Sequence, residues 1–323
     1  MMFNDKASPT LIGSTGDSLR EAFGRSLVAL ADEFPEMVVL DADVAGGTGA
    51  HHFRSAHPER FFQFGIAEQN MVSAAAGMAA AGLLPVVTTF AVFHLRALEQ
   101  ARLSVAYAQK NVKLVASHPG LDVGPDGGSA QALEDLAAFR AIPGMVVLSP
   151  SDPDEMLHAV RAMLVYNGPV YMRTGRSPAE RVPELADAFE LGRGRIVRGG
   201  DDVTIVACGV EVARAVEAAE HLKTQNIQAR VVAMSTVKPI DRELLERCAV
   251  ETGCLVVAED HNVHGGLGGA VAEAVAALRP VPIDFVGVPD TFGESGEPNE
   301  LATKYRIDAP AIVEAAIRSA GRR

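Results

Sequence analysis

Short apolar runs alternate with helical segments along this chain, and no other feature constrains its fold as strongly. The runs are mostly continuous instead of alternating with polar residues, which is typical of strands that are covered on both faces. Such strands, separated by helices, form a mainly parallel sheet. We therefore predict an α/β fold with strands at residues 37–41, 61–64, 85–90, 112–117, 145–149, 169–173, 203–207, 230–234, 255–258 and 283–288.

The segments between these strands predict helices, and the pattern lapses once. Prolines, glycines and charged residues dominate residues 174–202, which we expect to be a linker. Two doubly wound domains are expected on either side, at residues 1–190 and 191–323. Their helices are predicted at residues 18–33, 68–81, 95–109, 131–139, 153–166, 212–223, 242–251, 267–277 and 310–320.

Charge and composition exclude several classes of function. The formal net charge of −12, with no long basic run, argues against a nucleic-acid partner, because phosphate binding needs clustered Lys and Arg. Residues 69–94 lack Asp, Glu, Lys and Arg, but Gly77, Gly82 and Pro85 interrupt them, so a helix, a turn and a strand are expected instead of a membrane span. The first 17 residues have no apolar core of a signal peptide, which predicts a cytoplasmic protein.

The three cysteines and a glycine run offer no further site. Cys208, Cys248 and Cys254 have neither CxxC spacing nor a neighbouring metal-ligand histidine, and we expect them to be reduced and buried. The run GGLGG at residues 265–269 lacks the third glycine of a dinucleotide fingerprint, since position 271 is valine. It predicts a tight strand-to-helix turn.

One glutamate stands at the start of an unusually apolar helix. The predicted strand before it ends at Gly65, and a helix rich in Ala and Gly begins near Glu68. Such a carboxylate is often a first-turn residue that the helix dipole stabilises. It can also be a functional group in an apolar pocket, and these residues alone do not decide between the two.

The context of Glu68 resembles the pyrimidine-binding domain of transketolases. The strings are GIAEQNM at residues 65–71 and TTFAVF at 88–93, with DADVAGGTG at 41–49 before them. SHPGLDVGPDGGSAQALEDLAAFRAIPGM follows at 117–145 and GPVYMRTGR at 168–176. VKPID at 237–241 and VVAEDHNVHGGLGGAVAEAV at 256–275 are similar to the C-terminal domain of the same family. The resemblance covers essentially the whole chain, in the family's order and spacing.

The resemblance implies dependence on thiamine diphosphate and roles for individual residues. Glu68 would hydrogen-bond the aminopyrimidine ring and activate the cofactor, and an apolar pocket would help it to share a proton. Phe90 and Phe93 would pack on that ring, for which a flat apolar slot is suited. Asp43 would lie near the cofactor. The substrate-binding residues would be Thr48, His118, Asp126 and Arg173.

What the chain lacks is also informative. Thiamine enzymes hold the diphosphate through Mg²⁺ with a GDG motif followed by an asparagine, and no convincing copy is present. The resemblance therefore implies one subunit of a split transketolase, which transfers a two-carbon ketol unit from a ketose to an aldehyde. Mg²⁺ ligands are expected on an N-terminal partner subunit, in a heterotetramer of two plus two chains. The alternatives are the beta subunit of a 2-oxoacid dehydrogenase decarboxylase, a 1-deoxyxylulose-5-phosphate synthase and a non-catalytic scaffold subunit.

Three positions depart from the family pattern. Alanine stands at position 130 where a histidine is usual, and Pro125 precedes Asp126 where glutamate is usual. Gly47 replaces a serine that contacts phosphate in the family. Alanine offers no hydrogen bond or charge, so the sequence predicts a non-standard acceptor, for example one that is unphosphorylated, branched or carrier-bound. The other interpretation is an ordinary transketolase with a compensating histidine from the partner.

Overall fold

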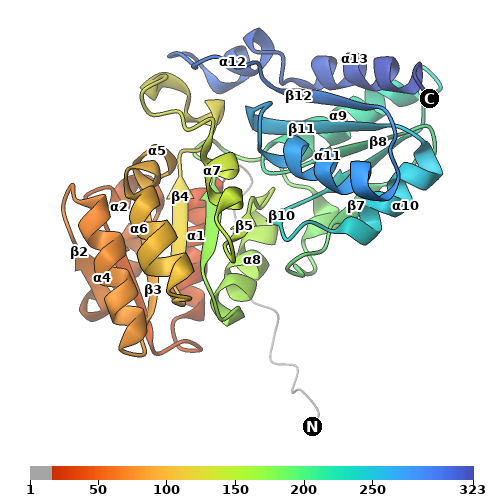
Figure 1. Ribbon diagram of the computed structural model, residues 1–323. Coiled ribbons are helices and arrows are strands. Elements are labelled where there is room, and N and C mark those ends of the chain that lie inside the picture. The colour runs from red at the N-terminus through yellow and green to blue at the C-terminus, as the bar shows by residue number, and fades with distance from the viewer. Residues whose placement is uncertain (1–16) are drawn as a thin grey trace.

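The computed structural model describes residues 17–323, which form two sheets with helices on both faces (Figure 1). The first sheet has the order β10-β5-β6-β4-β3-β1-β2 and the second β12-β11-β8-β9-β7. Every pair of neighbouring strands is parallel except β10–β5 and β7–β9. The predicted α/β class with mostly parallel sheets is confirmed.

The first domain contains six strands of the first sheet and the helices around them. Its strands are β1 (Met37–Asp41), β2 (Phe61–Gln63), β3 (Leu84–Phe90), β4 (Lys113–Ser117), β5 (Val146–Leu148) and β6 (Val170–Thr174). Its α-helices are α1 (Leu19–Leu30), α2 (Ala45–Thr48), α3 (His51–Ala56), α4 (Glu68–Ala80), α5 (Ala91–His94), α6 (Leu98–Gln100), α7 (Asp135–Ala141) and α8 (Pro153–Val165). Tighter or wider turns are η1 (Pro58–Arg60), η2 (Leu95–Ala97), the π-helical η3 (Ala101–Tyr107), η4 (Leu121–Asp126) and η5 (Pro183–Leu185).

The second domain repeats this plan around the second sheet. Its strands are β7 (Arg195–Arg198), β8 (Val203–Ala207), β9 (Ala229–Ala233), β10 (Thr236–Lys238), β11 (Leu255–Asn262) and β12 (Ile283–Val288). Its helices are α9 (Glu211–Lys223), α10 (Arg242–Thr252), α11 (Leu267–Leu278), α12 (Pro298–Lys304) and α13 (Ala309–Ala320).

Continuous apolar strands arise because both faces of each sheet are buried. In β1, Val38 and Leu40 pack into one core with α4, whereas Met37 and Val39 pack into another with α1 and α8. Successive side chains of a strand point to opposite faces. An entirely apolar run is therefore the pattern that two helical layers require.

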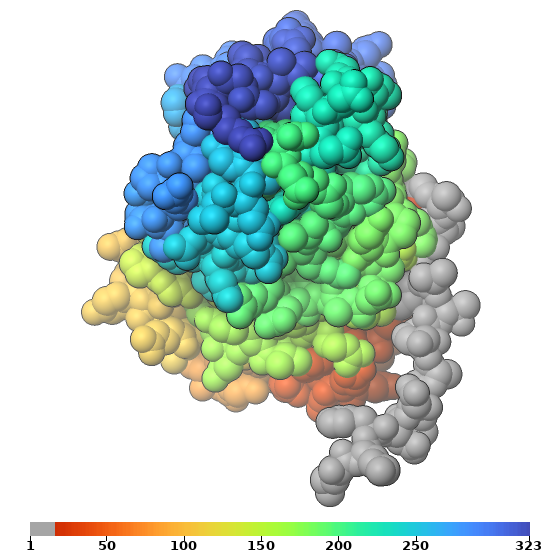
Figure 2. Space-filling model, turned by 90° about the vertical axis from the view of Figure 1, so that its right-hand side faces the viewer, coloured from red at the N-terminus to blue at the C-terminus, as the bar shows by residue number. Residues whose placement is uncertain are grey.

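The structure differs from the sequence prediction at two strands. The expected linker contains β7, an antiparallel edge strand of the second sheet. β10 follows the second domain's β9 but pairs antiparallel with β5 of the first sheet. Both strands include charged side chains and form no continuous apolar run, and their pairing depends on tertiary contacts. Figure 2 shows the green segment around the linker on the surface where the two domains meet.

The glycine run at residues 265–269 forms the predicted tight turn, and a carboxylate of the same chain is bound at this turn. The carboxylate of Glu259 accepts hydrogen bonds from the backbone N–H groups of Leu267 (2.6 Å) and Gly268 (2.8 Å) at the start of α11. A Cβ atom at Gly266 would overlap this carboxylate. The helix start therefore already holds an anion, in the position where a dinucleotide fold would hold a phosphate.

Residues 17–323 contain no helix that is long and apolar enough to cross a membrane. The charge-free stretch 69–94 forms most of α4, the whole of β3 and α5, as the sequence predicts. The expectation about a signal peptide concerns the first 17 residues, of which 1–16 lie outside the described part of the chain.

Candidate active site

The carboxyl ends of four neighbouring strands of the first sheet meet at one edge. The parallel register pairs Asp41 of β1 with Thr88 of β3, and Phe90 of β3 with Ser117 of β4. Ser117 pairs in turn with Thr174 of β6. Ligands of α/β proteins bind at this edge because the loops after adjacent strands converge there. The sheet therefore gathers segments that are distant in the sequence.

Glu68 is a buried carboxylate in the first turn of α4. It is only 4% exposed. Ala67, the residue before it, has a non-helical backbone conformation, so the helix begins at Glu68. Its Oε2 atom lies 3.5 Å from Nε of Arg96, whose side chain is 66% exposed. A buried acid whose cationic partner is largely exposed is the kind of group that a bound ligand can engage.

Two phenylalanines and a histidine form a stack at the end of β3. The rings of Phe90 and Phe93 lie 5.4 Å apart with 8° between their planes. The Phe90 ring also stacks on His118 at 3.8 Å and 20°. Gly47 packs against the same ring, because a Cβ atom there would lie 2.6 Å from Phe90 Cε1. Phe93 precedes Arg96 by one helical turn, so the stack and Glu68 share one part of the site.

The loop after β1 contains two aspartates with different environments. Asp41 is buried, and its carboxylate accepts hydrogen bonds from the N–H of Val44 (3.0 Å) and from Gln63 Nε2 (2.8 Å). Burial raises the pKa of Asp41, while these hydrogen bonds oppose the rise. Asp43, the predicted cofactor residue, is exposed and has a φ of 65°. Sequence reasoning did not predict Asp41, which orders the loop that presents Asp43.

Thr48 is buried at the end of α2. It is 2% exposed. Its Oγ1 donates a hydrogen bond to the carbonyl of Ala45 and accepts one from the N–H of Ala50, both at 3.3 Å. In this structure the hydroxyl group closes its own turn, and the substrate role expected for Thr48 stays a prediction.

His118 occupies a strained position at the end of β4. Its φ of 58° lies in the left-handed region, which is rare for a residue other than glycine and is often associated with functional sites. Nδ1 lies 3.0 Å from the hydroxyl of Ser117. Burial, together with the charges of Arg20 and Arg176, lowers the pKa of His118 to about 3. The imidazole is neutral near pH 7 and can exchange hydrogen bonds without carrying charge.

Sequence reasoning did not predict the two arginines beside His118. Arg20 of α1 donates a hydrogen bond to the carbonyl of Gly47 at 3.0 Å, and its Nε is buried without a partner. Arg176 lies 3.7 Å from the carboxylate of Asp126. Both arginines line a cleft of about 890 Å³ between the domains. Arg176 ends the string GPVYMRTGR and could have been noticed there, but no spacing signal marks Arg20.

The glycine-rich loop that carries Asp126 has an irregular backbone. Gly124 and Gly127 have φ values of 68° and 82°, which L-residues rarely adopt. The Asp126 side chain is 39% exposed beside Arg176, so solvent and a ligand can reach it. Ala130 is half-buried and its N–H donates to the carbonyl of Gly127.

Arg173 joins the two domains. Its Nε donates to Asp135 at 2.8 Å, a second nitrogen pairs with the other oxygen of Asp135, and Nη1 donates to the carbonyl of Asp260 at 2.9 Å. Burial alone would raise the pKa of Asp135, but the guanidinium holds it below its usual value. Its charge is therefore paired within the chain, and the substrate role predicted for Arg173 stays a prediction.

Further buried polar contacts surround this pair. The carboxylate of Asp260 on β11 accepts hydrogen bonds from the N–H groups of Leu121 (2.7 Å) and Asp122 (3.0 Å), which begin the glycine-rich loop. The carboxylate of Glu155 accepts from the hydroxyl of Ser235 at 2.8 Å. We call the buried contacts of Asp135, Glu155, Arg173, Ser235 and Asp260 the domain seam. The seam fixes the substrate loop to the second domain.

Three comparisons identify proteins similar to this chain. Residues 17–180 match the family model of the transketolase pyrimidine-binding domain, and residues 192–312 match that of the transketolase C-terminal domain. The "Putative transketolase C-terminal section" of Methanocaldococcus jannaschii is 42% identical over 306 residues, which cover 92% of this chain and 94% of that protein. The "6-deoxy-6-sulfo-D-fructose transketolase subunit SqwH" of a Clostridium species is 42% identical over 299 residues, with 92% and 93% coverage. A solved "Split gene transketolase, inactive beta4 tetramer" has a TM-score of 0.89 and 46% identity, and covers 95% of this chain and all of its own.

Proposed function

The chain belongs to the transketolase family as the C-terminal section of a split enzyme, and we propose that it completes its active site with an N-terminal subunit to transfer a two-carbon ketol unit from a ketose to an aldehyde. The observation that carries this proposal is the buried Glu68, linked through Arg96 to the turn that bears Phe93. The two relatives described above are named as a transketolase section and a transketolase subunit, so neither a 2-oxoacid dehydrogenase subunit nor a scaffold protein is favoured.

The residues at the sheet edge fit the aminopyrimidine half of thiamine diphosphate, on which this family depends. The stacked Phe90 and Phe93 offer a flat apolar surface, and Glu68 offers a carboxyl group at low exposure. When bound, thiamine diphosphate supplies a thiazolium carbon that acts as the nucleophile. Glu68 would hold and share a proton with the pyrimidine nitrogen, the phenylalanines would orient the ring and exclude water, and the exposed Asp43 would contact the cofactor.

The other half of the cofactor site would come from the partner. Mg²⁺ binds oxygen ligands and substrate phosphates, and we assign its protein ligands to the N-terminal subunit. Ile66, two residues before Glu68, is 78% exposed and would be covered by that subunit. Two copies of each chain would form the active heterotetramer. The relative solved as an inactive beta4 tetramer supports a second subunit as the requirement for activity.

The charges beside His118 indicate the substrate class. Arg20 and Arg176 place two guanidinium groups near a neutral imidazole, which suits the anionic end of a sugar phosphate or a sugar sulfonate. Asp126 and His118 would bind hydroxyl or carbonyl groups. Ala130 removes one side-chain contact, and one relative is a transketolase subunit for a sulfonated sugar. We therefore propose a non-standard, anionic sugar substrate.

Co-purification with the N-terminal subunit tests the assignment. The chain alone should have no turnover and weak affinity for thiamine diphosphate by calorimetry, whereas the assembled enzyme should transfer ketol units. Full activity of this chain alone would refute the split active site.

Substrate class is tested separately on the assembled enzyme. Specificity constants are compared for ribose 5-phosphate and ribose as acceptors, and for 6-deoxy-6-sulfofructose and fructose as donors, with the parent and with Arg176→Gln. The anionic sugars should be preferred, and Arg176→Gln should remove about 10-fold or more of that preference, since charge-assisted hydrogen bonds contribute about 1.5–3 kcal/mol. Arg279→Gln, an exposed arginine of the second domain, is the matched control. Equal specificity constants for the anionic and the neutral sugar of each pair, with the parent and the variant alike, would exclude recognition of an anionic end.

A further inference from the structure

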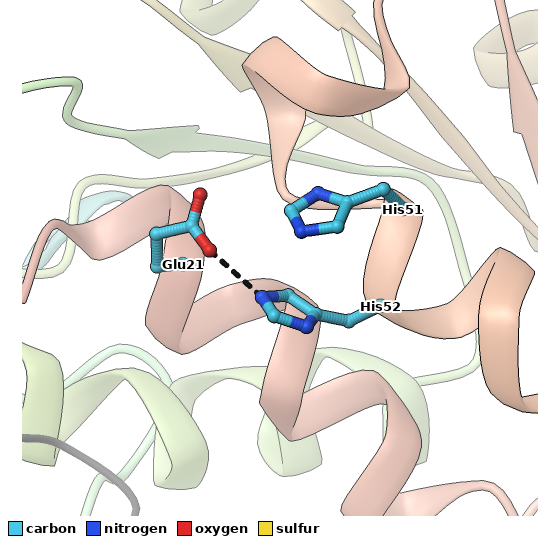
Figure 3. A group of neighbouring side chains, drawn as sticks. All are labelled: Glu21, His51 and His52. Atoms are coloured by element: carbon cyan, nitrogen blue, oxygen red, sulfur yellow. Dashed lines mark hydrogen bonds and ion pairs between the residues drawn. The ribbon is translucent and has the colours of Figure 1, made fainter.

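A glutamate and two adjacent histidines converge on the outer side of the first domain. Glu21 lies on α1, and His51 and His52 begin α3. One carboxylate oxygen and one ring nitrogen from each histidine lie within 4.8 Å of one another. Figure 3 shows the two rings and the carboxylate turned towards one another from two different helices. We propose that Glu21, His51 and His52 bind a divalent transition-metal ion of the zinc class.

The backbone fixes this convergence. A Cβ atom at Gly24 of α1 would overlap the carbonyl of Gly49, and one at Gly49 would overlap the carbonyl of Arg20. Gly49 also has a φ of 78°, a conformation that glycine adopts without strain. The two glycines therefore let α1 and the start of α3 approach backbone to backbone. This contact brings the three side chains together without any bound ligand.

The side chains are available as ligands. His52 Nε2 lies 2.7 Å from Glu21 Oε2, and the rings of His51 and His52 stack at 4.1 Å with 34° between their planes. Nδ1 of His51 is buried and has no hydrogen-bond partner. An ordinary ion pair between Glu21 and His52 explains one of these contacts. It does not explain why a second imidazole is held beside that pair with an unpaired nitrogen.

Solvent can reach the cluster. The side chains of Glu21 and His52 are 28% and 30% exposed. Next to His52 lies a hollow of about 520 Å³, lined also by Arg25, Val28 and Ala56 among others. An ion held by three protein ligands could therefore complete its coordination with water, as zinc does when one position stays open.

The types of ligand atom in this cluster favour a zinc-class ion over magnesium. Two imidazoles and one carboxylate suit Zn²⁺, Co²⁺ or Ni²⁺, whereas Mg²⁺ prefers an octahedron of oxygen ligands. A bound ion would tie α1 to α3. Since Arg20 of α1 contacts Gly47, and Gly47 packs on Phe90, the ion would also stiffen the segment beneath the cofactor residues.

The test uses the full-length chain, free of any affinity tag and stripped of metal. Co²⁺ is titrated and followed by its visible absorption, and Zn²⁺ and Mg²⁺ are then added as competitors. We expect one Co²⁺ per chain, displaced by Zn²⁺ but not by millimolar Mg²⁺. A saturating 100-fold excess of Zn²⁺ over its Kd should raise the Tm by about 4 °C, as expected for a ligand that binds only the folded chain.

Variants locate the site. Glu21→Gln and His51→Ala should each weaken Co²⁺ binding by at least about 100-fold, more than is typical for loss of an outer contact to a ligand. His221→Ala, an exposed histidine of α9, should leave binding unchanged. His51 is not a member of the ion pair, so its variant should keep the parent's Tm in the presence of a chelator. Absence of stoichiometric Co²⁺ binding, or equal binding by parent and His51→Ala, would show that the cluster is only an ion pair with a neighbouring imidazole. No part of this test depends on catalysis.

Discussion

The carboxyl edge of the first sheet, where Glu68 lies, and the domain seam differ in how their buried polar groups are paired. At the edge, Glu68 is buried, and its cationic partner Arg96 at 3.5 Å is exposed. In the seam, Asp135 and Arg173 are both buried and share two hydrogen bonds, with Asp260 accepting a third. The seam is satisfied within the chain, whereas the edge keeps capacity for a ligand and a partner. A buried charge therefore marks function here only where its partners are incomplete.

The largest expected effect concerns the edge. Glu68→Gln in the assembled enzyme should keep the fold and lower kcat by about 10²–10⁴-fold, because glutamine cannot share a proton as an acid. Hydrogen exchange at the thiazolium carbon measures this directly. Glu99→Gln, an exposed glutamate of α6, is the control. Unchanged exchange would make Glu68 a first-turn carboxylate and remove the contrast with the seam.

The seam should respond in stability. Arg173→Met should lower the free energy of unfolding by about 3–5 kcal/mol, because Asp135 would be left as an uncompensated buried charge. Denaturation by urea measures the change, and adding Asp135→Asn should recover part of it. A variant that unfolds like the parent but has a raised KM would instead support the substrate role predicted for Arg173.

The stability of the folded protein should also depend on pH through Glu155 of the seam. Burial raises the pKa of Glu155 to about 7 from an ordinary value near 4.5. The folded state therefore binds more protons than the unfolded state between these values, and stability falls as pH rises through them. Glu155→Gln mimics the protonated acid, so the parent should lose up to about 1.4 kcal/mol per pH unit relative to the variant.

Unfolding curves of both proteins at pH 4.5 to 7.5 provide the measurement. Burial lowers the pKa of His118 to about 3 and of His94 to about 4, which acts in the opposite direction. The difference between parent and variant removes these shared contributions. Parallel pH profiles would show that Glu155 is ionised in the folded protein.

The smallest effect is expected in the substrate loop. Ala130→His would return a hydrogen-bonding side chain, worth about 0.5–1.5 kcal/mol, or roughly 2- to 10-fold in the specificity constant for ribose 5-phosphate. Ala130→Gln is the control for added bulk. Efficient use of ribose 5-phosphate by the parent, with no gain from histidine, would contradict the non-standard acceptor.

Residue patterns predicted the parts of the fold that depend on local sequence. β1, β8 and β12 begin and end as predicted, since each is apolar and lies between clear turns. Residues 95–109 were predicted as one helix, but they divide into η2, α6 and the π-helical η3. β7 and β10 were missed because their residues, RIVR and TVK, include charged side chains and form no continuous apolar run.

The candidate site shows a similar limit. The positions of Phe90, Phe93 and His118 at one edge followed from strand order and could be anticipated. Spacing could not reveal that Asp135, far from Arg173 in sequence, neutralises it. Nor could it reveal that the Thr48 hydroxyl turns back to its own loop. Charge pairing across domains is a property of three-dimensional contacts.

The placement of β10 affects how the protein is made. β5 is covered on its outer side by Thr236–Lys238, which the ribosome delivers almost 90 residues after Leu148. Until then the nascent first domain exposes an unpaired strand edge, the kind of surface that recruits other chains. A fragment that stops near residue 190 would keep that edge permanently. The two domains of this chain are therefore one unit of biosynthesis, and the first cannot be finished before Thr236–Lys238 of the second have been translated.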